Sequence, residues 1–126
     1  MPAAVAENAK GRTRYEAGLS AEDAVARVYQ KRGWDVVAKR WRGKAGEIDL
    51  ILRRNGVLVF AEVKKSRSFD TAALRINAAQ MCRIMSAAQE FAAREPDGLL
   101  SDMRFDAALV DSRGGVRIIP NAFGAD

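Results

Sequence analysis

The stretch GEIDLILRRNGVLVFAEVK, residues 46–64, contains the pattern that decides the fold. Two apolar segments, Ile48–Arg53 and Val57–Lys64, flank the dipeptide Asn55-Gly56. An Asn-Gly pair between two such segments is the strongest short-range signal for a β-hairpin with a two-residue turn. We therefore predict two antiparallel strands joined at this dipeptide.

The turn determines which residues face each other across the hairpin. Counting back from a pair between Arg54 and Val57 sets Asp49 opposite Glu62, with Cβ atoms about 4.5–5.5 Å apart. Lys64 shares the face of Glu62, because side chains alternate along a strand. Three charged groups are thus expected at one end of an otherwise apolar hairpin. A longer loop or a bulge would shift this register.

Two opposed carboxylates repel each other, so a compensating cation is expected beside them. Mg²⁺, or Mn²⁺ in its place, suits such a site, because Mg²⁺ commonly takes one or two carboxylates plus water and phosphate oxygens. Asp49 and Glu62 are therefore candidate metal ligands. Lys64 could position or deprotonate an attacking water, or stabilise charge on a phosphate. The alternative is a salt-bridged strand end, in which Lys64 neutralises Glu62 or Glu47.

The rest of the chain predicts a single α/β domain in the order α-β-β-β-α-β-β. The first helix is expected to begin at an N-cap, Ser20, and to end at Gly33. The second helix is expected to begin near Asn77 and to end before Pro96. The other strands are expected at residues 34–39, 104–110 and 116–119, with a basic loop at 40–44 and a polar connection at 65–70. We expect residues 1–17 to form a flexible arm and residues 18–122 to form the domain.

Composition restricts the chemistry. The 126 residues include no histidine and one cysteine, which excludes disulfide frameworks, the usual zinc sites and histidine-based catalysis.

No apolar run approaches the roughly 20 residues that span a bilayer, and no signal-peptide stretch is present, so a cytoplasmic protein without a membrane partner is expected. The formal net charge of +5 suits a nucleic-acid partner, although many small proteins are mildly basic.

Two segments carry a resemblance to a known family. Residues 46–51, GEIDLI, and 58–64, LVFAEVK, resemble the GEIDLI and FVEVK motifs of the uncharacterised YraN-like bacterial proteins, which are related to the PD-(D/E)XK nuclease superfamily. The similarity runs from about residue 18 to residue 119. It implies a restriction endonuclease-like fold, a three-layer α/β/α domain with a central mixed β-sheet.

The resemblance also implies roles for individual residues. Asp49 and Glu62 would bind the metal, Lys64 would act on the water, and Glu22 of the first helix would supplement the catalytic site. A different interpretation of Glu22 is an acid in the first turn of a helix, where the helix dipole favours it.

Candidate nucleic-acid contacts lie on both sides of the hairpin, at Arg42, Lys44, Lys65, Arg67 and Gln80. The family usually has a basic residue where Gln80 stands, but a neutral amide can also hydrogen-bond a phosphate. The alternative for Gln80 is a capping box with Asn77. For the basic residues it is an ordinary solvated surface.

These observations favour Mg²⁺-dependent hydrolysis of phosphodiester bonds in nucleic acid, DNA rather than RNA. The rival from another class is a nucleic-acid-binding module that has the same fold but performs no chemistry, with Trp41 available for base stacking. A third interpretation is a protein-interaction role without nucleic acid. A junction-type substrate would favour a homodimer by symmetry.

Overall fold

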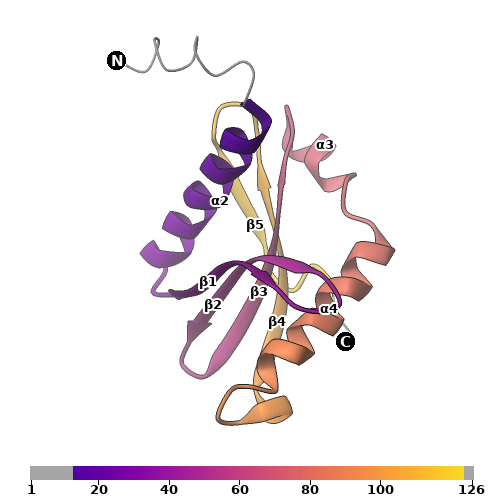
Figure 1. The fold of residues 1–126 in the computed structure, drawn as a ribbon. Helices are drawn as coiled ribbons and strands as arrows, with labels where there is room; N and C mark the ends of the chain where they lie inside the picture. Colours follow the sequence, from indigo (N-terminus) through magenta and orange to yellow (C-terminus); the bar gives the residue numbers. More distant parts are fainter. Residues whose placement is uncertain (1–12, 124–126) are drawn as a thin grey trace.

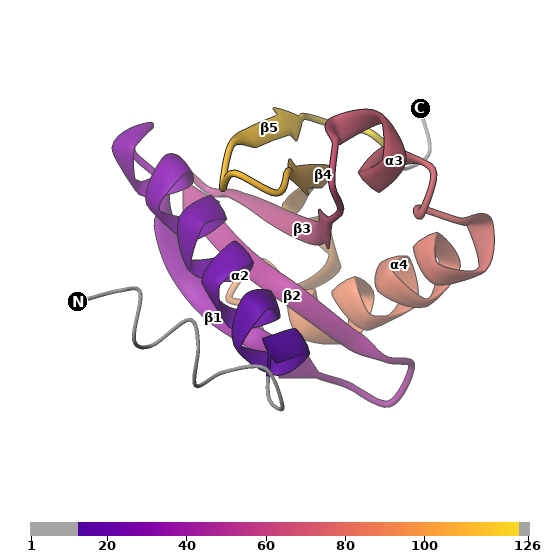
Figure 2. The same ribbon diagram turned by 90° about the horizontal axis from the view of Figure 1, so that it is seen from above.

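The computed structural model describes residues 13–123, which form a five-stranded mixed sheet with a long helix on each face (Figures 1 and 2). The strand order is β1-β2-β3-β4-β5, and all neighbours are antiparallel except β3 and β4, which are parallel. The elements are α2 (Thr13–Lys31), β1 (Asp35–Arg42), β2 (Glu47–Arg54), β3 (Val57–Lys65), α3 (Phe69–Ala73), α4 (Ala78–Ala92), the 3-10 turn η2 (Gly98–Leu100), β4 (Asp102–Val110) and β5 (Val116–Ile119).

The hairpin of β2 and β3 closes at Asn55-Gly56 as predicted. Both turn residues have positive φ, 50° and 80°, the combination that a type I′ turn requires. The ladder then runs from Arg54–Val57 to Leu50–Ala61 in the predicted register. It stops one pair before Asp49–Glu62, because β2 continues beside β1 while β3 continues beside β4.

Each face of the sheet buries its own apolar cluster, which makes the molecule three layers thick. On one face, α2 packs Val25 and Tyr29 against Leu52 and other residues of β2 to β4. On the other face, α4 packs Ile84 and Phe91 against the hairpin and β4. The hairpin contributes Ile51, Leu58 and Phe60 to this second cluster, as the alternation of side chains predicts. The predicted three-layer α/β/α fold with a mixed sheet is therefore confirmed.

Helix α2 begins earlier than predicted. It starts at Thr13, so Ser20 lies inside the helix and the predicted N-cap there is wrong. The segment before Ser20 contains Arg, Glu, Ala and Leu, which are good helix formers, and no proline interrupts it. Residues 13–17 of the expected arm are therefore helical, and residues 1–12 lie outside the described part of the chain. None of the described helices is long and apolar enough to cross a membrane.

Two connections also differ from the prediction. The expected loop at residues 40–44 is shorter, because Trp41 and Arg42 pair with Ile48 and Glu47 and extend β1. The expected polar connection after β3 contains the short helix α3. This helix forms because Ser68 Oγ caps it by accepting a hydrogen bond from the Thr71 N–H at 3.1 Å.

A buried carboxylate ties the two ends of the domain together. Asp106 of β4 is fully buried, and its Oδ2 accepts a hydrogen bond from the Tyr29 hydroxyl of α2 at 2.7 Å. Arg104 donates two more, at 2.9 and 2.8 Å, and the backbone N–H of Asn121 donates a fourth at 2.9 Å. Because every lone pair has a donor, Asp106 can stay charged inside the core.

Candidate metal centre

Glu62 and Lys64 project from β3 toward the layer of α4, on the same face as Phe60. The Lys64 Nζ atom lies 3.0 Å from Glu62 Oε2, and the two side chains are only 16% and 5% exposed. This pair matches the salt-bridged strand end that the sequence left open. It does not neutralise the site, because a second carboxylate lies beside it.

Asp49 supplies that second carboxylate from the start of β2. Its Oδ2 atom accepts a hydrogen bond from the backbone N–H of Val63 at 2.8 Å, and its carboxyl group lies close enough to that of Glu62 for the two charges to interact. Burial, followed by the charge of Asp49, raises the pKa of Glu62 to about 7. Burial likewise raises the pKa of Asp49, although the Val63 N–H opposes the shift. Asp49 and Glu62 thus meet as predicted, through their side chains rather than through a ladder pair.

Gln80 brings helix α4 into the same cluster. Its Nε2 atom donates a hydrogen bond to Glu62 Oε2, while its backbone N–H bonds the N-cap Asn77 at 2.9 Å. The predicted cap is therefore present, but the glutamine side chain turns to Glu62 instead of completing a capping box. Within residues 13–123, Gln80 Oε1 is the buried side-chain polar atom that lacks a hydrogen-bond partner. An unsatisfied oxygen thus lies next to the paired carboxylates.

Glu22 approaches from the opposite layer. It is 7% exposed on α2, and its Oε1 atom accepts a hydrogen bond from Arg40 Nε at 3.0 Å. Burial raises the pKa of Glu22, and the negative charge of Asp49 raises it further, while Arg40 opposes the shift. Glu22 is therefore close enough to Asp49 for the two charges to interact, but it has its own cation.

Arg40 is the residue at this site whose role the sequence did not reveal. We expected it in a solvated basic loop, but it lies on β1 with a φ of 52°. A non-glycine residue rarely adopts this left-handed conformation. In the sequence, Arg40 is simply one of several basic residues in the 40–44 segment. Its pairing with Glu22 could therefore be seen only in the folded chain.

The donor set fits a hard divalent cation. Asp49 and Glu62 offer adjacent carboxylate oxygens, and Gln80 Oε1 is an amide oxygen without a partner. Over residues 13–123, no group of three or more Asp, Glu, His or Cys side chains could hold a metal ion unaided. Mg²⁺ does not need such a group, because it usually keeps several waters and binds through one or two carboxylates plus phosphate oxygens.

The predicted nucleic-acid contacts lie at two separate places. Arg42 and Lys44 are exposed at the β1–β2 hairpin, where Arg42 lies 3.9 Å from Glu47. Lys65 and Arg67 lie beyond the site, at the end of β3. Gln80 lies inside the site rather than on the surface around it.

Trp41 also differs from the expectation of a free stacking platform. Its ring meets Phe91 edge-on, with centroids 5.4 Å apart, and the Arg94 guanidinium lies 5.4 Å above it. Trp41 therefore packs the β1–β2 hairpin against α4. The backbone N–H of Lys44 adds a hydrogen bond to Glu90 Oε1 at 2.8 Å and holds the hairpin tip to the same helix.

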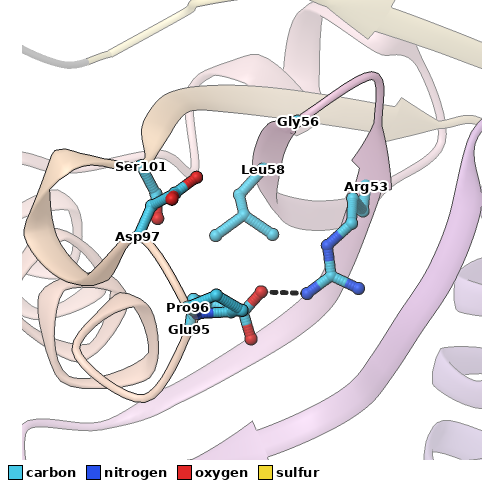
Figure 3. A pocket seen from close by; sticks show the side chains of 7 residues that line it. All are labelled: Arg53, Gly56, Leu58, Glu95, Pro96, Asp97 and Ser101. Atoms are coloured by element: carbon cyan, nitrogen blue, oxygen red, sulfur yellow. Dashed lines mark hydrogen bonds and ion pairs between the residues drawn. The ribbon is translucent and has the colours of Figure 1, made fainter.

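A pocket lies at the other end of the β2–β3 hairpin (Figure 3). Gly56 and Leu58 line it, and an ion pair between Arg53 and Glu95 closes one side. It is remote in register from the carboxylates, because Gly56 belongs to the turn at the opposite end of the strands. We do not assign it to the metal centre.

Comparison with known proteins places the chain in a family. The model of "Uncharacterised protein family UPF0102" matches residues 21–110. The chain belongs to this family. A UPF0102 protein of Roseobacter denitrificans is 56% identical over 122 residues, which are 97% of this chain and 95% of that protein. A UPF0102 protein of Cereibacter sphaeroides is 55% identical over 115 residues, 91% of this chain and 98% of that protein.

A third UPF0102 protein, from Ruegeria pomeroyi, is 52% identical over 115 residues, which cover 91% of this chain and 94% of that protein. The family expected from the GEIDLI and FVEVK motifs is therefore confirmed. The segment that matches the UPF0102 model includes every residue of the candidate metal centre, from Glu22 on α2 to Gln80 on α4.

Proposed function

We propose that this UPF0102 protein is a Mg²⁺-dependent nuclease that hydrolyses phosphodiester bonds in nucleic acid, with DNA as the favoured substrate. The observation that carries the proposal is the pair of adjacent carboxylates, the buried Glu62 and the half-buried Asp49, with Lys64 3.0 Å from Glu62. Burying two adjacent acids is unfavourable unless a cation or a proton compensates them. A site that exists for structure alone would gain stability by losing one acid.

Each residue has a distinct role in this proposal. Asp49 and Glu62 would hold the ion, and Gln80 fixes the orientation of Glu62 by hydrogen bonding. When bound, Mg²⁺ would supply Lewis-acid polarisation of a phosphate and a more acidic water. Lys64 places an ammonium group at the same carboxylate, where it can orient a water or stabilise negative charge on a phosphate oxygen. The Glu22–Arg40 pair sets the charge around Asp49 from the other layer.

Cleavage assays test the proposal directly. The full chain would be incubated with single-stranded, duplex and branched DNA, and with RNA, in Mg²⁺, Mn²⁺ or EDTA. We expect cleavage that needs the metal and falls by at least about 100-fold in Asp49→Asn and Lys64→Ala. Asp102→Asn is the matched control, because Asp102 is exposed at the far end of β4 and should retain full activity.

Metal binding has its own readout, which does not depend on turnover. Mn²⁺ should raise the melting temperature of the wild type and of Asp102→Asn, because a ligand that binds only the folded state stabilises it. It should not do so for Asp49→Asn. Absence of cleavage together with no Mn²⁺ effect on the wild type would reject the nuclease proposal.

The second candidate function is nucleic-acid binding without chemistry. It is favoured by the exposed cations at both sides of the carboxylates, including Arg42, Lys44 and Arg67. Binding that weakens steeply with salt, but is indifferent to Mg²⁺ and to Glu62→Gln, would support it over the nuclease.

A further inference from the structure

A group of five basic residues lies beside the metal centre, on the β5 side of it. They come from three segments that are distant in the sequence: the end of β3, the connection around α3, and the β4–β5 turn with β5 itself. We call this group the cationic rim, and its members are Lys65, Arg67, Arg75, Arg113 and Arg117. Figure 1 shows the end of β3, helix α3 and the β4–β5 connection close together at the same end of the sheet.

Hydrogen bonds join the first part of the rim. The Arg75 Nη1 atom donates to the backbone carbonyl of Lys65 at 2.8 Å, which fixes the segment after α3 to the end of β3. The Ser112 hydroxyl donates to the backbone carbonyl of Arg67 at 3.4 Å and brings the β4–β5 turn to the same place. These residues therefore share one surface although they are up to 47 positions apart, since 112 − 65 = 47.

The second part of the rim is fixed by the turn and by β5. The Arg117 guanidinium lies 4.7 Å from the ring centre of Phe69, the first residue of α3. Asp111 Oδ1 accepts the backbone N–H groups of Arg113 and Gly115, at 3.0 and 2.8 Å, which orders the turn. Both arginines are thus presented by ordered backbone.

The five cations of the rim outnumber the acids in the same segments of the chain. In the described part of the chain, none of the five cations forms a salt bridge. Two acids lie nearby in the sequence, Asp70 and Asp111, and the carboxylate of Asp111 already accepts backbone N–H groups. Several unpaired cations on one ordered surface repel each other, and a polyanion relieves that repulsion.

Arg117 of the rim projects from the same face of the sheet as Glu62 and Lys64. Val116 and Ile118 pack against the α2 cluster, so Arg117 between them projects toward the α4 layer, where Glu62 and Lys64 project. Lys65 directly follows Lys64 at the end of β3, so its side chain projects to the opposite, α2 face. Arg42 and Lys44, in contrast, lie at the β1–β2 hairpin on the other side of Asp49.

We propose that the cationic rim binds the sugar–phosphate backbone of a nucleic acid and holds the stretch of strand next to the phosphate at the metal centre. This inference rests on the proposed function and adds a second contact surface to it. The new residues are Arg113 and Arg117, which no motif of the sequence indicates. Their ligand is the repeated phosphate, so they contribute affinity without base preference.

The test is the salt dependence of binding to a duplex DNA in EDTA, where cleavage is stopped. Each phosphate contact on duplex DNA contributes about 0.9 to the slope of log affinity against log salt. The double variant Arg113→Gln/Arg117→Gln should therefore bind more weakly and lose about 2 from that slope. The matched control is Arg27→Gln/Lys31→Gln, which removes two exposed cations from α2 and should keep the wild-type slope.

The single variant Arg113→Gln is the control for loss of folding, because the Arg113 side chain is exposed and its replacement removes no contact. This variant should reduce the slope by about 1. Equal slopes for the rim variants and the α2 control would overturn the rim while leaving the nuclease proposal intact. A reduced slope, with neither metal-dependent cleavage nor a Mn²⁺ effect on the melting temperature, would support the rim and reject the nuclease. Binding to phosphatidylserine vesicles would be measured for the same variants. If the rim variants lost vesicle binding but kept wild-type DNA binding, the proposal for the rim would also be overturned.

Discussion

Asp49 accepts a hydrogen bond from the backbone N–H of Val63 in place of the ladder pair that it would otherwise form with Glu62. The side chain thereby fills the gap that opens where β2 leaves β3. One carboxylate thus has two functions, since it completes the hydrogen bonding of the divergent strands and faces Glu62 with its charge.

These two functions are separable in Asp49→Asn. The amide oxygen can still accept the Val63 N–H, so the variant should fold, while the charge beside Glu62 is gone. We expect the pKa of Glu62 to fall from about 7 toward its ordinary value, because the charge of Asp49 is the second largest cause of its rise. NMR titration of the Glu62 carboxyl carbon would measure this, and Asp102→Asn would leave the titration unchanged.

The stability of the metal-free protein should depend on pH through Glu62. Its pKa is about 7 in the folded state, against an ordinary value of 4.5 for a glutamate side chain, so the folded state binds the proton more tightly than the unfolded state. The free energy of unfolding should then decrease as pH rises from about 4.5 to about 7, by on the order of 3 kcal/mol. The raised pKa values of Asp49 and Glu22 act in the same direction.

Urea unfolding in EDTA at a series of pH values would measure this dependence. Glu62→Gln should flatten it, because a neutral amide cannot titrate, and should be more stable than the wild type at pH 8. Identical pH profiles for wild type and Glu62→Gln would contradict the assignment of the raised pKa to Glu62.

The Tyr29 hydroxyl should contribute to stability through Asp106. Tyr29→Phe keeps the ring packed edge-on against Trp34, but it removes the 2.7 Å hydrogen bond to a fully buried carboxylate. We expect the free energy of unfolding to fall by about 1–3 kcal/mol, as measured by chemical denaturation. Asp106→Asn should have a larger effect, because the charge that binds Arg104 would also be lost. A Tyr29→Phe protein as stable as wild type would show that the hydrogen bond is energetically neutral.

Arg40 should carry two opposing contributions. Its φ of 52° is unfavourable for a residue with a Cβ, while its guanidinium pairs with the buried Glu22. Arg40→Ala and Arg40→Gly both remove the guanidinium, but only glycine adopts this φ without strain. The glycine variant should be the more stable of the two by about 1–2 kcal/mol. Thermal unfolding of the pair measures that difference, and an alanine variant at least as stable would exclude backbone strain at this position.

The sequence predicted the part of the site that depends on local geometry. The Asn55-Gly56 turn sets the register by itself, so Asp49, Glu62 and Lys64 could be placed together from the alternation of two strands. The divergence of β2 from β3 could not be predicted, because it depends on pairing with β1 and β4. The approach of Gln80 required the position of α4, which no local signal specifies.

Contacts between residues that are distant in the sequence could not be predicted either. Tyr29 and Asp106 are 77 residues apart, and nothing near either residue indicates the partner. A weaker signal was present, because Asp106 is the one charged residue among the otherwise apolar residues 105–110, and such an acid must be hydrogen-bonded to be buried. The same limit applies to Glu22 and Arg40, whose pairing spans two layers of the fold.

The irregular course of β1 has a consequence for assembly. This edge strand shifts register between Val36 and Ala38, and its backbone takes a left-handed residue at Arg40. A strand from another molecule needs an unbroken row of N–H and C=O groups to add to a sheet, and charged side chains such as Lys39 oppose its approach. The distortion that directs Arg40 toward Glu22 therefore also protects the protein against edge-to-edge polymerisation at β1.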